Sequence, residues 1–305
     1  MGPEWIGFVT AVIAAVIAAA SQIMLFQFRS QAEKELEYLR VQFRRLEEVD
    51  KLRRRYSTPL LKSAEELYNK LNDVVKNRDR ALHYLEKLPG SVVDIRSMGD
   101  VLSSATSIYL TSILYLFARY FASVEAIKKD VGLLQLATEE ETKALQLRLR
   151  QTVAVFFSGR LHNNFKIRQE HRLKYEGRIL EGAQVLIGES MLREQNGLHE
   201  CISYYEFCHK IAGDEDFRQC LSPLLGFLSG LEEVSGINSE SSDVDFRWAK
   251  LIVFASFLRK LVEQIDSAKV VMLLPELKEY EQNYLAEHRE LQENIQYFKE
   301  AYPDP

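Results

Sequence analysis

A run of sulfur and imidazole side chains is the first feature of the sequence that could do chemistry. His199, Cys201, Cys208, His209 and Cys220 fall within 22 residues. Zinc favours four such ligands in a tetrahedron. The close Cys-x₂₋₄-Cys pair of most zinc sites is missing here, and a helix would point the neighbours Cys208 and His209 about 100° apart. We therefore expect no metal, small buried cysteines and surface or capping histidines, with His199, Cys201, Cys208 and Cys220 as the candidate ligand set.

A second candidate is the segment Arg78-Asp79-Arg80-Ala81-Leu82-His83. It resembles the Arg-x₄-His motif of HEPN ribonucleases, which are all-helical and usually dimeric. The resemblance implies that Arg78 would stabilise phosphate charge and that His83 would act as acid, base or orienting group. So short a motif also arises by chance, and Arg193 with His199 gives a second match at a longer spacing. We favour a charged, exposed helix face for Arg78 and His83.

The densest basic region of the chain follows Phe156 and Phe157. Its candidate phosphate or headgroup contacts are Arg160, His162, Lys166, Arg168, Arg172 and Lys174. These cations could meet a nucleotide, RNA or lipid phosphate, but we favour a mixed polar surface. The sequence also lacks the common phosphate-binding, serine-hydrolase and zinc-protease motifs. We therefore predict no cofactor, and we favour a protein that is not an enzyme.

The helices that carry these candidate residues follow a predicted membrane segment at the start of the sequence. Trp5 to Phe26 is a stretch of 22 residues without a charge. A helix of about 20 apolar residues spans the bilayer core. A cleaved signal peptide and a buried core helix are the alternatives. The signal peptide needs a basic start, and only Met1, Gly2, Pro3 and Glu4 precede the stretch. We predict a retained transmembrane helix.

The charges beside this stretch predict its orientation. No Lys or Arg precedes it, whereas Arg29, Lys34, Arg40, Arg44 and Arg45 follow closely. Cytoplasmic flanks carry the excess of Lys and Arg. The three cysteines agree, because an odd number suits a reducing compartment. The sequence therefore predicts a single-pass protein of the inner, or plasma, membrane with its C-terminal body in the cytoplasm.

The helix is expected to continue beyond the membrane as a stalk. No helix breaker lies between Phe26 and Arg55. Apolar residues recur at coiled-coil spacing over less than three heptads, and the candidate self-association residues are Leu25, Ala32, Leu36, Leu39, Phe43 and Leu46. The pattern fails at Asp50 and Arg53. Either a short coiled coil forms, or a single amphipathic helix packs on its own body.

The rest of the chain predicts an all-helical body. Ser57-Thr58-Pro59 has the form of a helix start, which would end the stalk and begin the first body helix. Val101–Ala118 carries no charge but six hydroxyls, so we expect a buried core helix and not a second membrane pass. Helical patterns also cover about 139–157, 178–194, 199–212, 215–229, 244–267 and 276–301. No segment alternates apolar and polar residues over enough positions to predict a β-sheet.

The chain resembles a set of uncharacterised bacterial proteins with one N-terminal membrane helix and a helical body. The matching segments are Tyr56–Leu61 with Ala64 and Leu67, Tyr120–Glu125, and Gly188–Glu189 ahead of the aromatic stretch Ser203–Phe207. The resemblance spans most of the part after the membrane segment. It implies the architecture and adds no activity.

Charge is distributed unevenly along the 305 residues. The net charge is −5, but residues 29–55 hold nine Lys or Arg and six Asp or Glu, a net of +3; removing these and Glu4 leaves −7 on residues 56–305. An acidic body disfavours nucleic acid as a partner.

We predict an all-α protein with an anchor at 1–27, a stalk at 28–56, a bundle at 57–234 and C-terminal helices of the same body at 235–305. The expected partners are the lipid bilayer and further copies of the chain, in a scaffold or interaction role. A membrane-tethered ribonuclease or a membrane-perturbing oligomer is the alternative.

Overall fold

The computed structural model describes residues 3–77, 104–131, 139–162, 177–195, 198–229, 231, 246–266, 282 and 289–303. Helices dominate these residues, and the described sheet has two strands. The all-α prediction is confirmed. The chain divides into two compact units, Met1–Leu52 and Arg53–Pro305. We call the first unit 1 and the second the body.

The first helix, α1, spans Pro3–Lys76 and includes Pro59. The predicted helix restart at Ser57-Thr58-Pro59 is therefore wrong. Proline removes one helical hydrogen bond and crowds the preceding turn, which usually ends a helix. Here the residues on either side are held by packing, because Tyr56, Leu60 and Ala64 are all buried within the body. Burial of that face outweighs the local cost of the proline.

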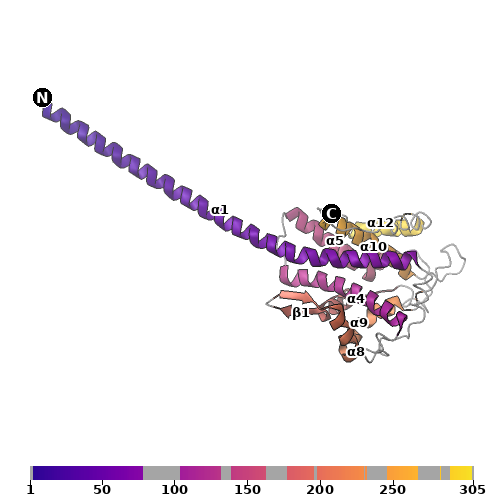
Figure 1. Cartoon of the computed structure of the whole chain (residues 1–305). Coiled ribbons are helices and arrows are strands. Elements are labelled where there is room, and N and C mark those ends of the chain that lie inside the picture. The colour runs from indigo at the N-terminus through magenta and orange to yellow at the C-terminus, as the bar shows by residue number, and fades with distance from the viewer. Residues whose placement is uncertain are drawn as a thin grey trace. The chain divides into compact units, whose positions relative to one another are not determined.

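The body elements after α1 are mostly short helices. They are α4 (Ala105–Ala126), the π-helical turn η2 (Ile127–Val131), α5 (Glu139–Phe157), the 3₁₀ turn η3 (Arg160–His162), α7 (Glu181–Ser190), β1 (Leu192–Gln195), β2 (Leu198–Cys201), α8 (Tyr204–Gly213), α9 (Glu215–Leu228), α10 (Phe246–Ile265) and α12 (Arg289–Ala301). In the view of Figure 1, α5, α10 and α12 lie above the last part of α1, and α4, α8, α9 and the hairpin lie below it.

Aromatic rings from three helices form the centre of the body. Phe254 of α10 lies 4.7 Å from Phe156 of α5 and 5.7 Å from Phe117 of α4, measured between ring centroids. Phe121 packs edge-on against Phe156 as well. All four side chains are almost wholly buried. Aromatic pairs at such distances add to the free energy gained by burying their area.

Helix α4 supplies much of this core. Among the residues whose side chains the structure describes, one helix, Ala105–Lys129, is long and apolar enough to cross a membrane by length and composition, and 78% of its most apolar window is buried. The buried core helix predicted for this region is therefore confirmed over its described part.

Residues 192–203 differ from the prediction. The helices expected at 178–194 and 199–212 are shorter, at Glu181–Ser190 and Tyr204–Gly213, because β1 and β2 form an antiparallel hairpin between them. Leu192 pairs with Cys201, and Gln195 pairs with Leu198. Strands of four residues are too short for alternation to stand out in a sequence. Ser203 then begins α8 with a reciprocal capping box to Glu206.

The acidic run after α8 behaves as expected of a helix start. The Asp214 side chain accepts a hydrogen bond from the Phe217 amide at 3.0 Å. Glu215 and Asp216 occupy the first turn of α9. Carboxylates there stabilise the positive end of the helix dipole. The helix predicted at 215–229 is thus confirmed as α9, Glu215–Leu228, and Asp214 caps its N-terminus.

Two wholly buried cations on α10 hold the ends of other helices. Arg247 donates from Nη1 to the carbonyl oxygens of Phe227 (3.2 Å) and Ser229 (2.7 Å), where α9 ends. Lys250 donates from Nζ to the carbonyls of Phe156 and Gly177, each at 3.1 Å, the first of them where α5 ends. The last carbonyls of a helix lack partners inside it. Arg247 and Lys250 therefore cap two helices from a third.

Helix α7 packs against α4 through a glycine. A Cβ atom placed at Gly188 would lie 2.8 Å from the Phe121 carbonyl oxygen and 2.9 Å from Cγ of Glu125. The adjacent Glu189 pairs with Lys129 at 2.6 Å. The missing side chain at Gly188 is thus what permits this close approach. A Cβ atom placed at Gly182, in the same helix, would have no neighbour within 4 Å.

We predict opposite effects for alanine at these two glycines. Gly188→Ala should lower the free energy of unfolding by about 1–3 kcal/mol, because the backbone of α4 cannot yield easily. Gly182→Ala should leave it unchanged or raise it by up to about 1 kcal/mol, as alanine favours helix. Urea unfolding followed by circular dichroism measures both. Equal effects would contradict the packing described for α7.

Candidate self-association surface

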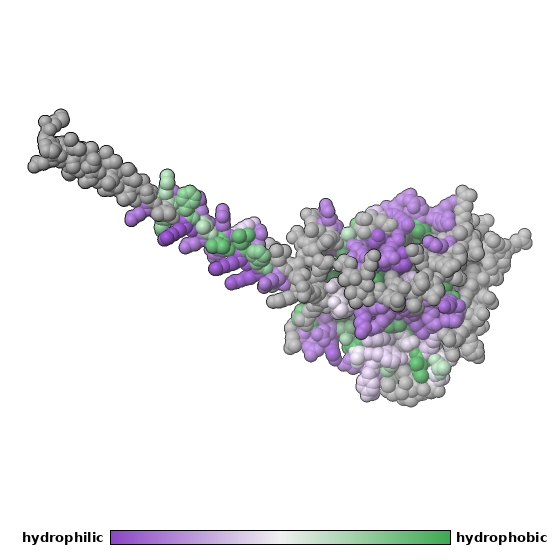
Figure 2. Space-filling model, turned by 45° about the horizontal axis from the view of Figure 1, so that its top comes forward, coloured by the Kyte–Doolittle hydropathy of each residue, from purple (hydrophilic) through white to green (hydrophobic). Residues whose placement is uncertain are grey.

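Unit 1 carries large apolar side chains that its own residues leave exposed. Glu, Lys, Arg, Leu and Gln dominate residues 29–47, all of them good helix formers. Exposed fractions run from 47% to 74% for Met24, Phe26, Phe28, Leu36, Tyr38, Leu39, Val41 and Phe43. Figure 2 shows hydrophobic side chains among hydrophilic ones along this part of the chain. Such surface is costly to leave in water, at about 25 cal/mol per Å².

Four positions of unit 1 share one face of α1. Ala32, Leu36, Leu39 and Phe43 follow each other at steps of four, three and four residues, which places them along one line of a helix. All four are exposed. We call them the stripe. Leu25 and Leu46 continue its spacing in α1, but their side chains lie outside the described ones.

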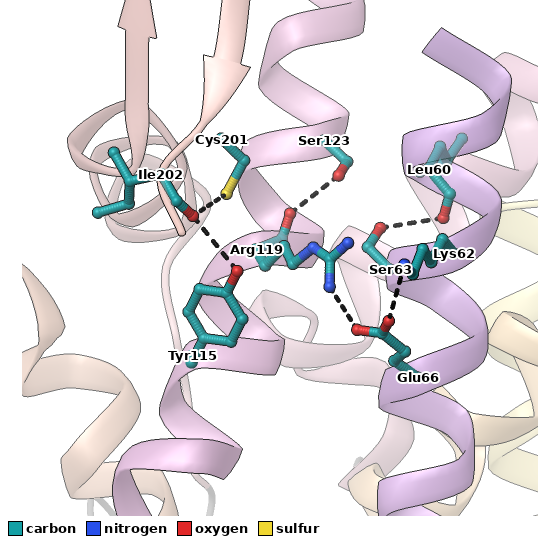
Figure 3. Close-up of polar contacts among 9 residues, drawn as sticks. All are labelled: Leu60, Lys62, Ser63, Glu66, Tyr115, Arg119, Ser123, Cys201 and Ile202. Atoms are coloured by element: carbon teal, nitrogen blue, oxygen red, sulfur yellow. Dashed lines mark hydrogen bonds and ion pairs between the residues drawn. The ribbon is translucent and has the colours of Figure 1, made fainter. Parts of the chain in front are cut away.

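The body holds a half-buried polar cluster that could be mistaken for a reaction centre. In Figure 3, Glu66 of α1 points at Arg119 of α4, and the two side chains form an ion pair. Lys62 lies 3.9 Å from the same carboxylate. The Tyr115 hydroxyl donates to the carbonyl of Ile202 at 3.3 Å, and the Cys201 thiol donates to that carbonyl at 3.5 Å. The cluster joins α1, α4 and the end of β2.

Electrostatics argue against chemistry at this cluster. Burial raises the pKa of the Cys201 thiol to about 12, more than the nearby charges of Arg119 and Arg193 lower it. Burial also raises the pKa of Tyr115, and the neighbouring Cys201 adds to the effect. A thiol kept protonated is a poor nucleophile and a poor metal ligand. The cluster is thus built to join elements.

The predicted metal candidates lie on separate elements. His199 and Cys201 belong to β2, Cys208 to α8 and Cys220 to α9. Burial raises the pKa of Cys208 as well, and all three cysteines are free thiols. The exposed His209 packs edge-on against Tyr205. Among the described residues, no three His, Cys, Asp or Glu side chains are grouped to hold a metal ion.

The other predicted sites fall mostly outside the described residues. Arg78 and His83 both lie there, as do Lys166, Arg168, Arg172 and Lys174. Of the basic region, the guanidinium of Arg160 lies 4.6 Å from the ring centre of Tyr297 in α12. His162 ends η3. Arg160 is therefore used in packing η3 on α12.

A small cavity opens between α10 and α12. It has a volume of about 100 Å³ and is lined by Ile252, Val253, Ser256, Phe257, Lys260, Ile295 and Lys299. Pockets that take drug-sized ligands usually measure about 300–1,000 Å³. This one is too small for a nucleotide or a large cofactor.

Comparison with protein families, with characterised proteins and with solved structures finds no match to this chain. The function must therefore be argued from the physical features of the chain itself. One such feature is the apolar surface of unit 1, which the other residues of that unit leave exposed.

The low reactivity expected of the Cys201 thiol can be tested directly. At pH 8 only about one Cys201 side chain in ten thousand is ionised at the stated pKa. Iodoacetamide should therefore modify Cys201 at least about 100-fold more slowly in native than in urea-unfolded protein, with the native rate rising as pH increases. The raised pKa also favours the folded state below about pH 8.5, a contribution lost as pH rises toward 12.

Peptide mass spectrometry measures the modification at each cysteine separately. A native rate at Cys201 that equals the unfolded rate at pH 8 would contradict the inert role assigned to this thiol.

Proposed function

We propose that this chain is a membrane-anchored, non-enzymatic protein that acts by assembling with copies of itself. Residues 1–27 would anchor it in the inner membrane, and the body would stand in the cytoplasm. The observation that carries the proposal is the stripe, an exposed apolar face at coiled-coil spacing that follows closely on the uncharged stretch Trp5–Phe26. Both features need a nonaqueous partner, one a bilayer and the other a protein.

Several features support this reading over a catalytic one. The thiols of Cys201 and Cys208 have raised pKa values, the cavity between α10 and α12 is small, and the polar cluster at Arg119 is taken up by contacts between elements. The body would thus contribute a folded mass or a binding face. The stripe would bring copies of the chain together, and the anchor would hold the assembly at the membrane.

Acidic substitutions in the stripe test the assembly. Leu39→Asp with Phe43→Asp should weaken self-association of the full chain in detergent at least about 100-fold, because each buried Leu or Phe contributes about 1.5–3 kcal/mol. The matched control is Tyr38→Asp with Val41→Asp, two exposed apolar residues on the same helix that lie off the stripe. It should associate like the unchanged chain. Sedimentation equilibrium in density-matched detergent measures the mass.

An unchanged oligomer mass in the Leu39→Asp, Phe43→Asp variant would refute the stripe as the interface. So would an equal loss in the control pair, since that would indicate general damage to α1.

Membrane attachment has its own test. Full-length protein should sediment with membranes, resist extraction by carbonate and dissolve in detergent, as an integral membrane helix does. A variant without residues 1–27 should appear in the soluble fraction. The body should also be shielded from protease added outside intact cells. If carbonate extracts the full-length chain from membranes, residues 1–27 are not an integral membrane helix. If the variant without residues 1–27 stays bound to membranes, these residues are not the anchor.

A further inference from the structure

The stripe has an oppositely charged residue on each side. With Leu36 and Phe43 at heptad positions a, and Ala32 and Leu39 at positions d, Glu35 occupies g and Arg40 occupies e. At 100° per residue, the Glu35 and Arg40 side chains lie about 140° apart around the helix, one on either flank. They are therefore too far apart around α1 to pair with each other in one chain.

Both side chains are exposed, and neither makes an ion pair with another described residue of its own chain. In two parallel, in-register helices, position g of one heptad faces position e of the next heptad in the other chain. Glu35 would then face Arg40 of the second copy, and twofold symmetry makes the contact twice. The remaining flank contacts of this register, Phe28 with Glu33 and Gln42 with Glu47, contain no like charges.

Displacement by one heptad gives the opposite result. Glu35 would then face Glu33 or Glu47 of the other chain, and like charges placed opposite each other weaken association. The charge pattern thus distinguishes between registers that the apolar stripe alone would tolerate. The parallel direction follows from the proposed function. Two chains anchored in one membrane with the same orientation have α1 helices that leave the membrane on the same side and run in the same direction.

We propose that the occupant of the stripe is a second copy of the chain, parallel and in register, with Glu35 of each copy paired to Arg40 of the other. This inference rests on the proposed function and deepens it. In this arrangement the apolar stripe supplies the affinity between the two copies, and Glu35 and Arg40 select the register.

Charge exchange tests the pairing in the full chain. Glu35→Arg alone, or Arg40→Glu alone, creates two like-charged contacts for each pair of chains and should weaken self-association by roughly tenfold at low salt. The variant with both changes should recover to within about twofold of the unchanged chain. An equimolar mixture of the two single variants should form mixed pairs in preference to like pairs. Energy transfer between labelled copies in detergent measures all of these.

The matched controls are Glu37→Arg and Arg44→Glu, which make the same charge changes at exposed positions on the outer side of the helix. They should leave self-association unchanged. In about 0.5 M salt the difference between the single variants and the unchanged chain should shrink, because screening weakens exposed charge pairs.

Two results would overturn the inference in different ways. If the unchanged chain associates but the single variants associate equally well, or the double variant is no better than either, the register is wrong and the assembly still stands. If the unchanged chain is monomeric in both detergent and lipid nanodiscs, the proposed function fails as well.

Discussion

The body depends on two charges placed inside it. Arg247 and Lys250 are wholly buried on α10 and donate to carbonyls at the ends of α9 and α5. A buried charge is tolerated only when its hydrogen bonds are made, so these contacts also fix where α5 and α9 end. Gly177 adopts a φ of +51° beside Arg247, where a Cβ atom would meet Cγ of that arginine at 2.3 Å. The glycine is required both by its backbone conformation and by the space.

Several further groups of the described body are engaged in packing or kept neutral. Its central rings pack on each other, the thiols of Cys201 and Cys208 resist ionisation, and Glu66 and Arg119 neutralise one another. The body exposes some large apolar residues, among them Leu180 and Leu186, whereas in unit 1 all those whose side chains the structure describes are about half to three quarters exposed. The exposed apolar residues of unit 1 at coiled-coil spacing are the basis for the function proposed for that unit.

Helices could be predicted from the sequence where their apolar periodicity is long and regular. α9, α10 and the buried α4 match expectation, since their apolar faces extend over several turns. The hairpin was missed, although Asn196-Gly197 between two apolar-flanked segments is a known turn signal. The helix restart predicted at Pro59 was wrong because burial of the residues around it in the body outweighs the usual tendency of proline to interrupt a helix. Arg247 and Lys250 were missed because charge usually indicates exposure; the apolar residues on all sides of them, such as Phe246, Trp248 and Leu251, were the available signal.

The central claim is that a second copy covers the stripe. Disulfide trapping in native membranes tests it most directly, because two d positions of a parallel pair come within disulfide reach. The raised thiol pKa values of Cys201 and Cys208 slow their oxidation. Under mild oxidation, Leu39→Cys should form a covalent dimer, whereas Val41→Cys and the unchanged chain should not. A Leu39→Cys variant that crosslinks no more than Val41→Cys would contradict the account.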